Sequence, residues 1–393
     1  MKGDKNLWVL ICVCIINSLG FGIIVPLLYS YGKKFGITET SVGFLTASFS
    51  IAQFFATPLL GAISDKWGRK PVLAISLAGT CASFLLFATA HSLIMLFAAR
   101  ILDGITGGNI SVAQAMISDS STAADRAKKF GYLSSAFGFG FVLGPALGGL
   151  LSKYGLQVPF YFAAGIAMLG TLATIFLLKE TYTKDKRKEG TKSKFTFASL
   201  VTVIKKPVVG TAVLTGFLLT MGQFTMIIGF QTFSVDVLKI KPEQIGLFYT
   251  GFGITGIIMQ LCVPFFTRVF SSKSVILLFS TMFCLGAMIL AGFTNGFLLF
   301  AICLFVYGLF NGLRNPMLNA IIADHNDPKK QGEILGVNQS YASIGQTLGP
   351  IGAGLITVIS VHFIFFLSAF YILAGFLLTF RLKTKENTNK ATA

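Results

Sequence analysis

The sequence predicts an all-α membrane protein with twelve transmembrane helices in two pseudo-symmetric six-helix bundles. The 393 residues are 54% apolar and only 12% charged, with 40 Phe and 42 Gly. A soluble domain of this length could not remove so much apolar surface from water. Apolar runs of roughly 20 residues, the length that crosses a hydrocarbon core as a helix, recur along the chain. A third observation, the sequence similarity of the two halves, indicates the two bundles.

The apolar runs are continuous rather than alternating, which indicates helices, because lipid offers no partners to backbone polar groups. We place the spans at residues 7–30, 42–62, 72–90, 93–117, 130–151, 158–178, 208–232, 243–266, 274–293, 296–322, 334–357 and 360–380. The dense polar run from Lys184 to Glu189 is typical of a solvated linker. The predicted organisation is an N-terminal bundle over 1–180, a cytoplasmic linker over 181–206 and a C-terminal bundle over 207–393.

Basic residues predict the orientation of these spans. Only five of the 32 Lys and Arg fall in the loops that follow odd-numbered spans, and two, Arg100 and Arg314, lie inside spans. The others occupy the tails and the loops on the opposite side. The positive-inside rule therefore predicts a multi-pass protein of the cell (plasma) membrane with both termini in the cytoplasm. The net charge of +17 is spread over many loops, which argues against a nucleic-acid partner.

Residues suited to metal binding or covalent chemistry are not grouped. The six cysteines lie in apolar spans without metal-ligand spacing, so we expect no metal and no cofactor. No G-x-x-x-x-G-K-[ST] nucleotide loop is present. No constellation of histidines, acids and nucleophiles occurs at span depth, which argues against an enzyme.

The two halves of the chain repeat each other at a nearly fixed offset. The superimposed pairs are Asp119 and Asp324, Gly140 and Gly345, Gly144–Pro145 and Gly349–Pro350, Gly149 and Gly354 at a shift of about 205, and Gly43 and Gly246 at about 203. Internal repeats of this kind are typical of secondary transporters, whose substrate site lies near the membrane midplane between the repeats.

Three motifs carry a resemblance to a known family. They are Gly61-Ala-Ile-Ser-Asp65-Lys-Trp-Gly68-Arg69-Lys between spans two and three, Arg100-Ile-Leu-Asp-Gly-Ile-Thr-Gly-Gly108 in span four, and Gly140-Phe-Val-Leu-Gly144-Pro145-Ala-Leu-Gly148-Gly149 in span five. They resemble the loop, fourth-span and antiporter motifs of the major facilitator superfamily. Spacing explains the third motif, because glycines at i, i+4 and i+8 let a neighbouring helix approach closely and a proline permits a kink.

The resemblance extends over nearly the whole chain to the twelve-span drug:proton antiporters, and to tetracycline efflux proteins in particular. It implies proton-coupled efflux of small amphipathic compounds, such as drugs, by alternating access. It also implies a conformational latch made by Gly61, Asp65, Gly68 and Arg69, with Asp119 as the acidic partner. The expected partners are a small-molecule substrate, protons and the lipid bilayer, and we expect a functional monomer.

The departures from the family pattern concern acids. Tetracycline efflux proteins carry acids in the first and third spans where this chain has Asn17 and Ser83, and some multidrug relatives carry one in the tenth span where it has Asn311. Asp103 remains inside span four, three residues after Arg100, so the two can share a helix face. A charge at this depth is a functional hypothesis by default. Asp103 either carries the proton or forms a static pair with Arg100.

Polar uncharged residues at span depth are candidates to line a substrate cavity, together with Arg314. They are Asn17, Gln53, Asn109, Gln114, Gln223, Gln231, Gln260, Asn311, Asn315, Asn338, Gln339, Tyr341 and Gln346. The excess of fixed positive charge in the spans disfavours cationic cargo and favours neutral or anionic cargo. Two alternatives stay open: a sugar or metabolite transporter of the same fold, working by uniport or symport, and a membrane enzyme or receptor of similar topology.

Overall fold

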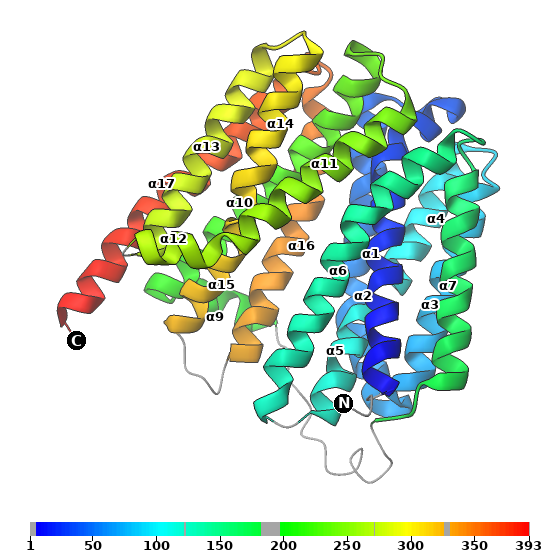
Figure 1. The fold of residues 1–393 in the computed structure, drawn as a ribbon, viewed down its shortest axis with the longest axis horizontal. Helices are drawn as coiled ribbons and strands as arrows, with labels where there is room; N and C mark the ends of the chain where they lie inside the picture. Colours follow the sequence, from blue (N-terminus) through cyan, green and yellow to red (C-terminus); the bar gives the residue numbers. More distant parts are fainter. Residues whose placement is uncertain (1–4, 122, 182–196, 271, 326–330, 393) are drawn as a thin grey trace. The chain divides into compact units, whose positions relative to one another are not determined.

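The computed structural model describes residues 5–121, 123–181, 197–270, 272–325 and 331–392 (Figure 1). Nearly all of these residues are helical, and none of them lies in a strand. The helices of the first half are α1 (Lys5–Gly32), η1 (Lys33–Phe35), α2 (Glu39–Trp67), α3 (Arg69–Ala88), α4 (Leu93–Thr106), α5 (Asn109–Ser120), α6 (Ala123–Ser152) and α7 (Val158–Leu177). Those of the second half are α9 (Phe197–Ile204), α10 (Pro207–Thr232), the π-helix η2 (Phe233–Val237), α11 (Pro242–Leu261), α12 (Val263–Val269), α13 (Lys273–Phe293), α14 (Phe297–Asn311), α15 (Arg314–Asp324), α16 (Gln331–Ile356) and α17 (Phe363–Thr392).

Eleven helical stretches of the described chain are long and apolar enough to cross a membrane. They correspond to the predicted spans except the eleventh, 334–357, which is α16. Its 26 residues make a helix about 39 Å long, more than a bilayer core requires. Its amide and hydroxyl side chains lower its hydropathy, and a span so rich in polar groups suits a helix that faces protein or water rather than lipid.

Three predicted spans are interrupted in the structure. Spans four and ten each consist of two helices, α4 and α5 or α14 and α15, separated at Gly107–Gly108 and at Gly312–Leu313. Glycine weakens a helix interior because it has the largest conformational freedom to lose. Span eight ends at Leu261, and Pro264 takes up an early position of the next short helix, α12, where a proline is tolerated.

The predicted linker is partly helical. Residues 197–204 form α9, and Val203 on this helix is buried. The polar run from Lys184 to Glu189 lies outside the described residues. Gly210, in the first turn of α10, has no room for a Cβ because the backbone of Ile204 occupies the space. This close approach fixes the end of α9 against α10.

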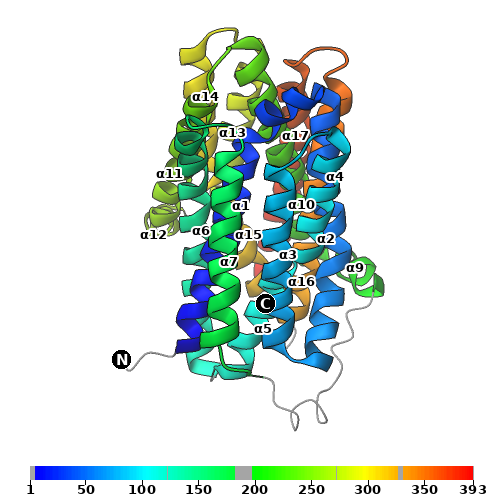
Figure 2. The ribbon, with the colours of Figure 1, turned by 90° about the vertical axis from the view of Figure 1, so that its right-hand side faces the viewer.

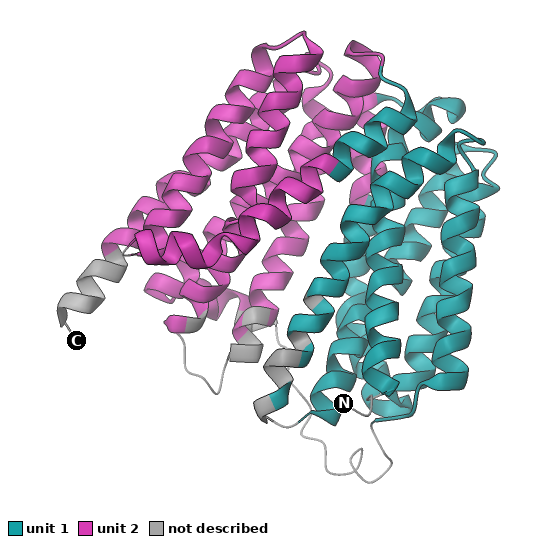
Figure 3. Ribbon diagram, viewed as in Figure 1, with its two compact units in different colours: residues 1–38, 48–193, 240–250 teal, residues 39–47, 194–239, 251–393 magenta. Residues whose placement is uncertain are grey.

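The chain divides into two compact units (Figure 3). Unit 1 comprises residues 1–38, 48–193 and 240–250, and unit 2 comprises 39–47, 194–239 and 251–393. Residues 39–47 at the start of α2 and residues 240–250 at the start of α11 each belong to the unit formed mainly by the other half of the chain. In unit 1 the extensive helix pairs are α1 with α6 (Figure 1) and α3 with α7 (Figure 2). In unit 2, α10 packs along α16 and α17.

Glycines create the closest of these contacts. A Cβ on Gly144 of α6 would lie 2.6 Å from the carbonyl oxygen of Leu19 on α1, and one on Gly349 of α16 would lie 2.6 Å from that of Met221 on α10. The same contact therefore recurs in each unit, at positions that the sequence repeat superimposes. Backbone-to-backbone approach of this kind is what small residues provide in membrane helix packing.

Candidate functional site

The ion pair on α4 lies in the interior of unit 1. The Arg100 Nη1 donates to Asp103 Oδ2 at 3.2 Å, and the Arg100 side chain is only 1% exposed. The guanidinium also stacks on the ring of Phe49 from α2, with Cζ 4.4 Å from the ring centroid. This stacking is possible because Gly104, one turn along α4, has no Cβ and lets the Phe49 backbone come close. Arg100 and Asp103 are therefore held together, as their i, i+3 spacing predicted.

Hydroxyl groups on one face of α3 contact the C-terminal half of α4. Ser76 donates to the backbone oxygen of Thr106, and the hydroxyls of Thr80 and Thr106 lie 3.2 Å apart. Ser83, on the same face of α3, lies beside the Asp103 carboxylate. Ser83 is the third-span position at which the family resemblance predicts an acid. It therefore lies next to Asp103, the acid that this chain has in span four.

Asn17, at the position of the other missing acid, takes part in a small amide network. It accepts from Asn109 Nδ2 at 3.2 Å and donates to the Val13 carbonyl at 2.9 Å. Asn109 is fully buried and begins α5. Gln53 of α2 donates to the carbonyl of Gly107 at 3.2 Å. Asn17 and Gln53 therefore bind the two sides of the break in span four.

The predicted latch residues meet at the turn between α2 and α3. Arg69 contacts Asp65 Oδ1 through Nη1 at 2.6 Å and Asp119 Oδ2 through Nε at 3.2 Å. Gly68 has φ of 110°, a conformation that strains any residue with a side chain. Gly61 lies in the last turns of α2 with nothing within 4 Å of an added Cβ, so close packing does not require a glycine there.

Two latch partners were not predicted, because they follow span six. Glu180 accepts from the backbone N–H groups of Arg69 and Lys70, both at 3.2 Å, and so caps the first turn of α3. A carboxylate at a helix N-terminus is stabilised by the helix dipole and by the unpaired N–H groups. Thr181 donates to Asp119 at 3.5 Å. The chain leaving α7 is thereby fixed to the latch.

Unit 2 has a simpler counterpart of this arrangement. Asp324, which the repeat superimposes on Asp119, forms an ion pair with Lys273 at the start of α13. Lys273 corresponds to Arg69 at an offset of 204, a relation that the sequence comparison could have found. The pair is exposed, with 35% of the Lys273 side chain and 50% of the Asp324 side chain accessible.

The glycines of the antiporter motif contact two different helices. Gly140, Gly144 and Gly148 face the backbone of α1, where a Cβ on Gly148 would lie 3.2 Å from the Ile23 oxygen. Gly149 instead faces the first turns of α11, 2.9 Å from the Glu243 oxygen. The Pro145 carbonyl lies against Gly246 of α11, at the place where a Cβ would be.

Arg314 is buried in unit 2 and bonds only to neutral groups among the described residues. Nη1 donates to the Leu219 carbonyl at 2.9 Å, Nη2 to Gln223 Oε1 at 2.6 Å and Nε to Asn315 Oδ1 at 3.3 Å. Leu219 and Gln223 are one turn apart on α10. Arg314 begins α15 as Asn109 begins α5, so it is the counterpart of Asn109, and Gln223 is that of Asn17.

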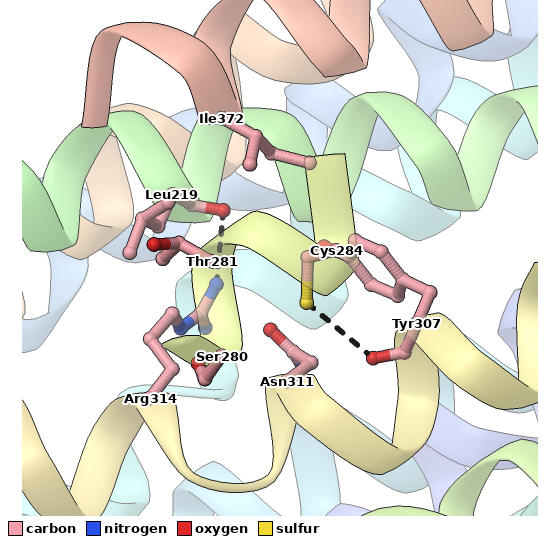
Figure 4. Close-up of a pocket in the computed structure, with 8 residues that line it drawn as sticks. All are labelled: Leu219, Ser280, Thr281, Cys284, Tyr307, Asn311, Arg314 and Ile372. Carbon is pink, nitrogen blue, oxygen red and sulfur yellow. Dashed lines mark hydrogen bonds between the residues drawn. The ribbon is translucent and has the colours of Figure 1, made fainter. Parts of the chain in front are cut away.

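A small pocket opens beside Arg314 (Figure 4). Its walls come from α10, α13, α14, α15 and α17, and its polar side chains include Ser280, Thr281 and Asn311. The pocket has a cavity volume of about 10 Å³, measured as the space open to the centre of a water molecule. This is room for roughly one water molecule. The Ser280 hydroxyl is fully buried without a hydrogen-bond partner in the described structure. Sequence reasoning missed Ser280, since a lone serine in an apolar span carries no signal.

The other predicted cavity residues are dispersed. Gln114 is exposed on α5, whereas Gln231 is 1% exposed on α10, and its Oε1 has no partner among the described residues. Asn338 donates to Asn319 at 3.4 Å, and the Tyr341 hydroxyl donates to the Leu200 carbonyl of α9 at 3.5 Å.

Comparison with known proteins places this geometry in context. The family model of the Major Facilitator Superfamily matches residues 10–263 and 212–393. Quinolone resistance protein NorA of Staphylococcus aureus is 28% identical, over 98% of this chain and 99% of the relative. Multidrug resistance protein 2 of Bacillus subtilis is 27% identical over 95% and 94%, and the class C tetracycline resistance protein of Escherichia coli is 31% identical over 89% of both.

Solved structures agree on the fold. The nucleoside transporter NupG superimposes with a TM-score of 0.78 at 17% identity, over 97% of this chain and 99% of that protein. The human organic anion transporter MFSD10 gives 0.71 at 20% identity, over 96% and 100%. At these identities the likeness concerns architecture alone.

Proposed function

The chain belongs to the major facilitator superfamily, and from that premise we propose that it exports small amphipathic compounds in exchange for protons by alternating access. The relatives named for quinolone, multidrug and tetracycline resistance support drugs as the cargo class. The chain is a multi-pass membrane protein, and the distribution of its basic residues supports cytoplasmic termini. On this proposal it catalyses transport and no covalent reaction, and it acts as a monomer.

The buried Arg100–Asp103 pair carries the proposal. Asp103 is the one acid of the 15 Asp and Glu in the sequence that lies in the middle of a predicted span. Burial favours the neutral acid, whereas the guanidinium favours the carboxylate. A change of conformation that alters the contact between them therefore changes proton occupancy. The Ser83 hydroxyl lies beside the carboxyl group and donates to the Thr80 carbonyl at 2.7 Å.

The latch supports the conformational part of the proposal. Arg69 binds two carboxylates, Asp65 and Asp119, at the turn between two spans. A network of this kind stabilises one arrangement of the helix ends and must loosen in another. The second candidate function is uniport of a metabolite, which the amides at Asn17 and Asn311 favour, because an amide cannot exchange a proton.

The test uses inside-out vesicles that contain the protein and a pH-sensitive dye. The lumen is acidified, and tetracycline, chloramphenicol, a neutral sugar and a cationic dye are added in turn. We expect proton efflux on addition of a drug, absent from empty vesicles. Asp103→Asn should abolish it, Asp103→Glu should retain part of it, and Asp125→Asn, which alters an acid outside the predicted spans, should leave it unchanged. Cargo flux without proton movement would establish uniport instead.

A further inference from the structure

The pocket beside Arg314 contains hydrogen-bond donors and a positive charge but no acid. Arg314 is 6% exposed, and none of the described residues that line the pocket is acidic. Removing a guanidinium from water without an opposite charge is expensive, and neutral hydrogen bonds compensate only part of the cost. The buried arginine of unit 1, Arg100, occupies a different position of the repeat, and Asp103 compensates its charge. Among the described residues of the pocket, no negative charge balances the Arg314 guanidinium.

The donors of the pocket remain available. The bonds of Arg314 to Leu219, Gln223 and Asn315 use three of the five N–H groups of a guanidinium. The buried Ser280 hydroxyl has no partner in the described structure. The amide of Asn311 forms no hydrogen bond with a described residue, and Figure 4 shows it beside the same space. An N–H or O–H without an acceptor in a buried site is unfavourable.

We propose that this pocket binds one small monoanionic group, held by Arg314, Ser280 and Asn311. The group is either an inorganic halide or the carboxylate of a transported compound, since both present a single negative charge to N–H and O–H donors. The free space is about that of one water molecule, so the pocket suits a single small ion or the end of one carboxylate group rather than a bulky sulfonate such as isethionate. The site itself does not depend on proton exchange, and only the carboxylate of a cargo rests on the proposed function.

Binding is tested on the purified full-length protein, without any pH gradient. Thermal unfolding is followed in sodium chloride, sodium acetate and sodium isethionate at equal ionic strength, the last being a bulky sulfonate reference. Chloride and acetate should each raise the Tm saturably above the reference, because a ligand that binds only the folded state stabilises it. Ser280→Ala should raise the half-saturating chloride concentration about tenfold, the loss of a hydrogen bond to a charged partner.

Two more variants keep the result interpretable if Arg314→Gln does not fold. Asn311→Asp supplies the missing negative charge from the protein, so it should abolish the chloride effect while unfolding at or above the wild-type temperature in isethionate. Thr215→Val is the matched control, because this buried hydroxyl of unit 2 donates within its own helix to Thr211. It should respond to chloride as the wild type does. An identical chloride response in wild type, Ser280→Ala and Asn311→Asp, or no response in any of them, would overturn the proposal.

The source of the anion is decided by transport. If a cargo carboxylate uses the site, chloride should raise the KM of ciprofloxacin, which carries a carboxylate, and leave that of neutral chloramphenicol unchanged. If neither KM changes while the chloride effect on the Tm persists, the occupant is the inorganic ion. Failure of proton exchange in vesicles would contradict the proposed function and leave the thermal result standing.

Discussion

Arg100 in unit 1 and Arg314 in unit 2 are both buried guanidinium groups near a break in a span, but they are compensated differently. Arg100 contacts a carboxylate and an aromatic face. Arg314 contacts a backbone carbonyl and two side-chain amides. The first arrangement contains a group that can gain and lose a proton, and the second contains a permanent charge. The difference teaches that two halves of one repeat can keep the same glycine packing and place their buried charges at different positions.

The ends of the two units differ in the same direction. In unit 1 the predicted latch residues Asp65, Arg69 and Asp119 form one network with Glu180 and Thr181. In unit 2 the ion pair that the described residues form at the equivalent place is the exposed one between Lys273 and Asp324. The repeat therefore preserves the packing glycines of both units more closely than it preserves their charges.

The largest effect is expected from removing the base of the unit 1 pair. Arg100→Gln leaves the Asp103 carboxyl buried without its cation, so we expect a loss of about 3–5 kcal/mol of stability or a permanently protonated acid. In either case proton exchange in vesicles should fall by at least tenfold. The double variant Arg100→Gln with Asp103→Asn should have a Tm close to that of the wild type, because no unpaired charge remains. It should still show no proton exchange. Wild-type exchange in the single variant would contradict a role for the pair.

The glycine contacts provide the next test, and here the two units should behave alike. A Cβ at Gly43 would fall on the Pro350 carbonyl, and one at Gly246 on that of Pro145. Alanine at either position should lower stability by about 1–3 kcal/mol, the usual cost of overpacking. Gly61→Ala is the control, because its Cβ would meet no atom within 4 Å and alanine favours the helix. Thermal unfolding of the three variants measures the difference, and an equal loss in Gly61→Ala would contradict it.

Helices and near contacts were predictable from sequence, since they depend on local patterns. Runs of apolar residues indicated the spans, the i, i+3 spacing indicated that Arg100 and Asp103 share a helix face, and the family resemblance indicated the latch residues Asp65, Arg69 and Asp119. The offset of the repeat aligned the glycines that pack in both units. Each of these signals is carried by residues close in sequence, by the family resemblance or by one fixed shift.

Contacts between distant segments were not predictable in this way. Glu180 lies 111 residues from Arg69, and nothing in the polar residues after span six distinguishes a helix cap from a solvated linker. Ser280 is a candidate binding residue only because it lies beside Arg314, which belongs to another helix. The breaks in spans four and ten were also missed, because a single glycine or glycine pair within an apolar run is common in membrane helices that do continue.

The ion pairs of Arg69 in unit 1 and of Lys273 in unit 2 should respond unequally when the basic residue is replaced. Arg69→Gln removes a nearly buried guanidinium from two carboxylates, and we expect a loss of about 1–3 kcal/mol. Lys273→Gln breaks an exposed pair, which is worth roughly 0–1 kcal/mol. Unfolding at low and high salt separates the two, because salt screens the exposed pair more strongly. A larger loss in Lys273→Gln would reverse the assignment of the main latch to unit 1.

The smallest effect concerns the cap that Glu180 provides to α3. Glu180→Gln keeps an acceptor but removes the charge that interacts with the helix N-terminus, so a loss of about 0.3–1 kcal/mol is expected. Amide hydrogen exchange should become faster at Arg69 and Lys70, whose N–H groups the carboxylate accepts. Glu39→Gln, which changes an acid in the first turn of α2, should leave those two amides unchanged. If both variants exchange like the wild type at Arg69 and Lys70, the Glu180 carboxylate does not anchor the first turn of α3.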